Sequence, residues 1–110
     1  MTDFESLVVA VRRFAEERDW ERFHTPKNLA MAIAGEAGEL AAELQWVDGA
    51  TSGELMRSDH ELRSRVALEM ADLLIYLARL ADVTGIDAVG AAFEKLSINE
   101  QRFQKPESGS

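Results

Sequence analysis

The chain has 110 residues, contains no cysteine, and carries 12 basic against 20 acidic residues, a formal net charge of −8. This length suits one domain, and 46% apolar residues are enough for a folded core. The acidic balance argues against binding to a DNA or RNA polymer, which requires a basic surface. No apolar run approaches the roughly 20 residues of a membrane span. The lack of cysteine suits a reducing compartment, so we expect a cytoplasmic protein without a membrane partner.

The pattern of apolar residues predicts an all-α fold, because they recur at helical spacing and only two prolines interrupt the chain. Thr25 followed by Pro26 is a helix-start signal, and Gly85 is a left-handed helix stop. The predicted helices cover about 3–18, 26–46, 59–83 and 88–103, with a short helical turn near 54–57. We assign residues 1–105 to one domain and expect 106–110 to be a disordered tail.

Two of these helices carry carboxylates in apolar surroundings. The first half of the stretch 28–46 is apolar on every side, which is typical of a buried helix, yet the stretch contains Glu36 and Glu39. The other helix repeats this pattern with Glu69 and Asp72. Residues three apart project from nearly the same face, and burying unpaired carboxylates is very costly. The sequence therefore predicts a cage of four carboxylates around a hard cation such as Mg²⁺.

Ion pairs are the alternative way to satisfy these acids. Their candidate partners are Arg12, Arg13, Arg63, Arg65 and Arg79. Two matched acid pairs on two apolar helices favour a metal over such ion pairs. Gly35 and Gly38 bracket the first glutamate, and we expect them to allow close approach of a neighbouring backbone or a ligand.

The connector at 19–24 contains two aromatic residues and a histidine. Phe23 is expected to be buried at the end of the helical bundle. Trp20 and His24 are expected either to be buried there as well or to contact a ligand. Tyr76 falls on the same helix face as Glu69 and Asp72. It is expected either to contact a ligand or to be an aromatic residue of the core. The last predicted helix carries a line of polar residues on one face: Lys95, Asn99 and Arg102. This face is either functional or simply exposed to solvent.

Together these motifs resemble the MazG-like, all-α nucleoside triphosphate pyrophosphatase superfamily, and more closely its dCTP pyrophosphatase branch. The segments that carry the resemblance are 17–21, 23–24, 26–29, 35–40, 45–46, 72–77 and 95–99. Two departures stand out. Val11 occupies a position where animal relatives have histidine, and their Arg-Tyr-Pro after the last helix is replaced by Arg102-Phe103-Gln104.

The resemblance implies a four-helix bundle that forms a homo-oligomer, with a tetramer favoured over a dimer and sites completed between subunits. It implies Mg²⁺, with Mn²⁺ as a substitute, held by the catalytic acids Glu36, Glu39, Glu69 and Asp72. The implied reaction is nucleotide-pool house-cleaning, in which dCTP or 5-modified dCTP is hydrolysed to the monophosphate and pyrophosphate. The implied nucleoside contacts are Trp20, Glu21, Arg22, Phe23, His24 and Trp46. The implied sugar or phosphate contacts are Tyr76, Lys95 and Asn99.

Other functions remain open at the level of sequence. The same enzyme class acting on another nucleotide such as dUTP is one, and a non-catalytic nucleotide-binding or assembly module is another. A di-iron bundle needs Glu-x-x-His pairs on its helices, and neither His24 nor His60 supplies one on the acid-bearing helices. For the hydrolase, Glu36 or Glu39 is the expected acceptor of the proton from water.

Overall fold

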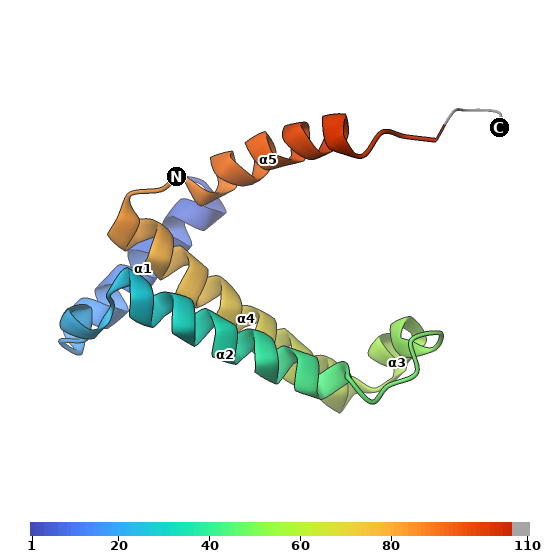
Figure 1. Cartoon of the computed structure of the whole chain (residues 1–110). Coiled ribbons are helices and arrows are strands. Elements are labelled where there is room, and N and C mark those ends of the chain that lie inside the picture. Colours follow the sequence, from blue (N-terminus) through green and yellow to red (C-terminus); the bar gives the residue numbers. More distant parts are fainter. Residues whose placement is uncertain (107–110) are drawn as a thin grey trace.

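The computed structural model describes residues 1–106, and within this range every regular element is helical (Figure 1). The prediction of an all-α fold is therefore confirmed. In chain order the elements are α1 (Asp3–Glu17), η1 (Glu21–Phe23, a 3₁₀ turn), α2 (Pro26–Leu44), α3 (Ser52–Ser58), α4 (His60–Thr84) and α5 (Ala88–Arg102). The short turn expected near 54–57 is the helix α3. Of the expected tail, residues 107–110 lie outside the described part of the chain.

Side chains at the helix starts explain why the boundaries fall close to those predicted. Thr2 and Glu5 form a reciprocal capping box, and the Thr25 hydroxyl accepts a hydrogen bond from the Asn28 amide at 3.1 Å. Asp59 caps α4 through its carboxylate in the same way. Gly85 ends α4 with φ 70°, a left-handed conformation that glycine adopts without steric cost.

The helices α2 and α4 form an antiparallel pair, and α1 crosses α4 near its C-terminal end (Figure 1). The buried apolar side chains at these contacts are Ala15, Leu29, Leu62, Val66, Ala78 and Ala81. The helix α5 leaves the end of α4 and makes no extensive contact with the other helices of the described chain. A closed four-helix bundle is therefore not formed within one chain.

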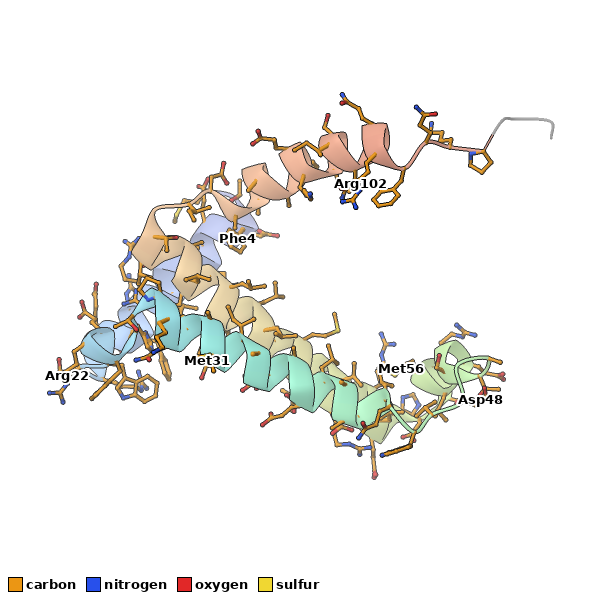
Figure 2. All side chains as sticks on the ribbon, viewed as in Figure 1. Phe4, Arg22, Met31, Asp48, Met56 and Arg102 are labelled. Carbon is orange, nitrogen blue, oxygen red and sulfur yellow. The ribbon has the colours of Figure 1, made fainter. Side chains whose placement is uncertain are left out.

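The apolar first half of α2 is not covered on every side within the single chain. Leu29 is fully buried, but Met31, labelled in Figure 2, is 66% exposed. Leu68 on α4 and Phe93 on α5 are 66% and 69% exposed. The physical reason is that, among the described residues, the extensive packing of α2 is against α4 alone, so much of its remaining apolar circumference stays exposed.

The predicted close approach at the helix glycines is also not made within the chain. A Cβ built at Gly35 or Gly38 would meet no atom within 4 Å. This side of α2 is therefore open space in the single chain. In the described part of the chain, none of the helices has the length and apolar character needed to cross a membrane.

Candidate active site

The antiparallel pairing of α2 and α4 brings carboxylates from both helices together. Glu36 on α2 and Glu69 and Asp72 on α4 offer oxygen atoms that all lie within 4.8 Å of one another. Glu39 does not belong to this trio. Its charge is nevertheless close enough to raise the pKa of both Glu36 and Glu69. The structure thus brings three of the four predicted acids to one place and leaves the fourth beside them.

The local electrostatics are unfavourable unless a cation is present. Burial, then hydrogen bonding with Glu69 and repulsion by the neighbouring carboxylates, raise the pKa of Glu36 to about 7. The pKa of Glu69 is also raised, chiefly by burial. One oxygen of each, Oε2, is buried without a hydrogen-bond partner among the described residues. Such unpaired buried oxygens are destabilising unless a ligand satisfies them.

Three of the five arginines considered as alternative partners, Arg12, Arg65 and Arg79, pair with other acids. Arg65 pairs with Glu43 at 2.9 Å, and Arg79 pairs with Asp82 at 3.0 Å. In the described chain, no ion pair reaches any of the four predicted metal-binding acids. The ion-pair alternative is therefore not what the structure contains.

A cavity of about 460 Å³ connects the acids to the aromatic connector. Glu36 and Asp72 line it from α2 and α4, while Trp20 and His24 line it from the connector. Tyr76 follows Asp72 by one helical turn on α4 and also lines the cavity, so it is not simply a core aromatic. The remaining lining residues are Val11, Phe14, Ala15, Ile75 and Arg79. Aromatic side chains suit a planar portion of a ligand, and the acids suit a polyanionic portion only when a cation lies between the two sets of charges.

The connector is held in place by local contacts. Trp20 packs edge-to-face against Phe14, with ring centroids 5.5 Å apart, and also against the His24 ring, with centroids 6.4 Å apart. The Asn28 side chain donates a hydrogen bond to the Phe23 carbonyl at 2.9 Å. The expectation that Phe23 plugs the bundle is wrong, because η1 turns its ring outward, where it is 55% exposed and lies beneath the Arg22 guanidinium.

Several predicted substrate contacts are not brought to this cavity by the single chain. Trp46 is 89% exposed beyond the end of α2, at the opposite end of that helix from Trp20. Lys95 and Asn99 lie on α5, the helix that ends at Arg102 away from the α2–α4 pair (Figure 2). The others outside the cavity lining are Glu21, Arg22 and Phe23.

One cavity residue, Arg79, was not predicted as part of the site. Its sequence position contains a signal, since it follows Asp72 by seven residues and Tyr76 by three and therefore shares their helix face. From the sequence, Arg79 was predicted only as a possible ion-pair partner of the acid cluster. The structure instead places its guanidinium against His24 and Asp82.

Comparisons with known proteins agree with this arrangement, although no family model matches the chain. It is 46% identical to dCTP pyrophosphatase 1 of Homo sapiens over 92 residues and 43% identical to that of Rattus norvegicus over 90. Both alignments cover 82% of this chain and 52% of the relative, so the chain spans about half the length of these curated relatives. A crystal structure of a pyrophosphatase from Archaeoglobus fulgidus is 36% identical, with a TM-score of 0.83, covering 96% of this chain and 95% of that chain.

The chain therefore belongs to the MazG-like, all-α nucleoside triphosphate pyrophosphatase superfamily. Within it, the similarity is to the dCTP pyrophosphatases.

Proposed function

We propose that this chain is a Mg²⁺-dependent pyrophosphohydrolase that converts dCTP or 5-modified dCTP to the monophosphate and pyrophosphate. The observation that carries the proposal is one cavity lined by Glu36 and Asp72, members of the carboxylate trio, and by Trp20 and His24. The dCTP pyrophosphatases named above support the choice of substrate. Removal of unwanted nucleotides from the precursor pool is the role that we infer, with residues 1–105 as the catalytic domain.

The donor set fits a hard divalent cation. Glu36, Glu69 and Asp72 supply closely spaced oxygens, and the buried Oε2 atoms of the two glutamates lack any other partner in the described chain. We propose that these three acids, with Glu39, hold Mg²⁺ or Mn²⁺. When bound, the metal would neutralise phosphate charge and lower the pKa of a bound water.

The remaining chemistry falls to residues of the chain. A carboxylate that is not fully engaged as a ligand can accept the proton of the attacking water. Because Glu39 lies outside the closely spaced trio, it suits this role better than Glu36. Trp20 offers a ring face for stacking on the base, and Tyr76 lines the same cavity on the helix that carries Asp72.

We further propose that the site is completed by other copies of the chain, in a tetramer ahead of a dimer. The Cα radius of gyration is 17.5 Å, whereas a compact domain of this length has about 13 Å. The accessible surface is 8502 Å², against about 6,100 Å² for a compact monomer of this mass. The difference is comparable with the area buried in obligate interfaces. Assembly would cover the exposed apolar faces of α2, α4 and α5 and could bring Trp46, Lys95 and Asn99 to a neighbouring cavity.

A substrate panel with purified protein, Mg²⁺ and pyrophosphate detection tests the activity. We expect dCTP and 5-substituted dCTP to give the highest kcat/KM, ahead of dUTP and the purine nucleotides. In ¹⁸O-labelled water the label should enter the monophosphate, because attack at the α-phosphorus releases unlabelled pyrophosphate. Release of orthophosphate, or label in pyrophosphate, would contradict this reaction.

The substitution Glu39→Gln tests the acid cluster, because it removes a charge with little change in volume. We expect activity to be lost while the circular dichroism spectrum is retained. Glu54→Gln on α3 is the matched control and should keep full activity. Activity that survives both Glu39→Gln and EDTA would contradict the metal site. Nucleotide binding without turnover in the unsubstituted protein would favour the non-catalytic module instead.

Light scattering tests the assembly. We expect the mass of a tetramer or dimer at micromolar concentration. A mass near the 12.2 kDa of one chain would contradict assembly without excluding hydrolysis.

A further inference from the structure

Arg79 is a buried charge that the metal cluster does not use. It is 5% exposed, and its Nε donates a hydrogen bond to His24 Nδ1 at 3.0 Å. Its Nη1 donates to Asp82 Oδ2, also at 3.0 Å. Arg79 and His24 are 55 residues apart in sequence, and both line the cavity that holds Glu36 and Asp72.

The chemistry of this contact determines where the histidine proton lies. Arginine has only donors and stays protonated in proteins, so the ring nitrogen that faces it must accept. With Nδ1 as the acceptor, the neutral imidazole carries its proton on Nε2. Burial and the positive charge of Arg79 both lower the pKa of His24, which keeps the ring neutral.

Arg79 is itself held firmly in position. Asp82 lies three residues further along α4 and accepts from Arg79 through Oδ2. Arg12 on α1 donates to the same carboxylate through Nε, at 2.9 Å, and through Nη2. This network joins α1, α4 and the connector, so the orientation of the His24 ring depends on rigid helices rather than on the connector alone.

We propose that Arg79 is a positioning residue, which holds His24 in the Nε2-protonated form so that His24 donates a hydrogen bond to the base of the nucleotide. The proposal rests on the proposed function for the identity of the base. Cytosine presents two acceptors, O2 and N3, that such a donor can meet. Stacking on Trp20 tolerates any base, whereas a fixed donor selects for an acceptor at one position.

The first test is a nuclear magnetic resonance measurement on the full ¹⁵N-labelled protein without substrate. The chain has two histidines, and His60→Gln identifies the signals of His24. We expect a protonated Nε2, an unprotonated Nδ1, and a scalar coupling across the hydrogen bond between Arg79 Nε and His24 Nδ1. A protonated Nδ1, or no coupling in the native protein, would overturn the proposal.

The second test compares kinetics of Arg79→Met and Arg79→Lys with dCTP. Arg79→Met should raise KM about five- to tenfold, the effect of one lost hydrogen bond, and leave kcat within about twofold. Arg79→Lys retains a donor and should recover part of the KM. Arg65→Met, which removes an exposed ion pair on the same helix, is the matched control. The Mg²⁺ concentration for half-maximal activity should not change, which separates this role from a general loss of structure.

These outcomes separate the two proposals. An unchanged KM in Arg79→Met, with native hydrolysis of dCTP, would overturn the positioning role and leave the proposed function intact. If the native protein hydrolyses no nucleotide, the proposed function fails. The resonance measurement then still decides whether Arg79 sets the protonation of His24.

Discussion

The substitution Asp82→Asn probes the network of buried charge in the structure. Asp82 is the only carboxylate paired with Arg79 in the described chain, and their side chains are 14% and 6% exposed. Asparagine can still accept a hydrogen bond, but it cannot compensate the charge of a guanidinium that stays protonated. Breaking a buried ion pair by removing one partner typically destabilises by 3–5 kcal/mol. We expect about 3 kcal/mol, because the asparagine oxygen and His24 still accept from Arg79.

Arg12→Met provides the contrast for this experiment. Arg12 also pairs with Asp82, but its side chain is 46% exposed, so solvent screens its charge. Its removal leaves Asp82 paired with Arg79, and we expect a much smaller loss of stability than for Asp82→Asn. Arg79→Met should likewise be close to neutral, because it removes the buried charge and leaves Asp82 with Arg12.

Denaturant unfolding in EDTA, at one fixed protein concentration, measures these differences free of metal and mass-action effects. For a chain of this length, about 3 kcal/mol corresponds to a fall in Tm of roughly 10–20 °C. If Asp82→Asn is no less stable than Arg12→Met, the buried charge of Arg79 does not depend on Asp82, and the reasoning is refuted.

Two further predictions concern pH and the base. Because the pKa of Glu36 is raised to about 7, the metal-free folded state binds its proton more tightly than the unfolded state. The stability of the metal-free protein should therefore fall as pH rises from about 4.5 through 7, and Glu36→Gln should reduce this slope in urea titrations. An equal slope in both proteins would contradict the pKa shift. Trp46→Ala should raise KM for dCTP more than it lowers kcat, since stacking stabilises ground and transition states alike. An unchanged KM in steady-state assays would show that Trp46 does not reach a cavity.

Much of the local structure could be predicted from sequence, because the signals involved are local. The cap at Thr25, the stop at Gly85 and the apolar periodicity act within one or two turns of a helix. The spacing of Glu36 and Glu39 likewise placed both acids on nearly the same side of one helix. Such features follow from backbone geometry, and they hold whatever the helix later packs against.

The errors arose where a residue depends on what lies opposite it. Phe23 was expected to be buried and is exposed, because the direction of η1 decides which way its ring faces. The apolar circumference around Met31 predicts burial, but within the described chain α4 is the main packing partner of α2 and Met31 stays exposed. An apolar surface predicts that the surface is buried, but it does not predict which chain covers it.

The sequence by itself determined the helices, the two acid pairs and the family resemblance. The antiparallel pairing of α2 with α4 decided that Glu36 meets Glu69 and Asp72 while Glu39 lies outside the trio. The same tertiary packing placed Arg79 against His24, a contact that no helical period could indicate. The physical reason is that periodicity specifies a face of each helix, whereas the distance between atoms on different helices depends on how those faces pack.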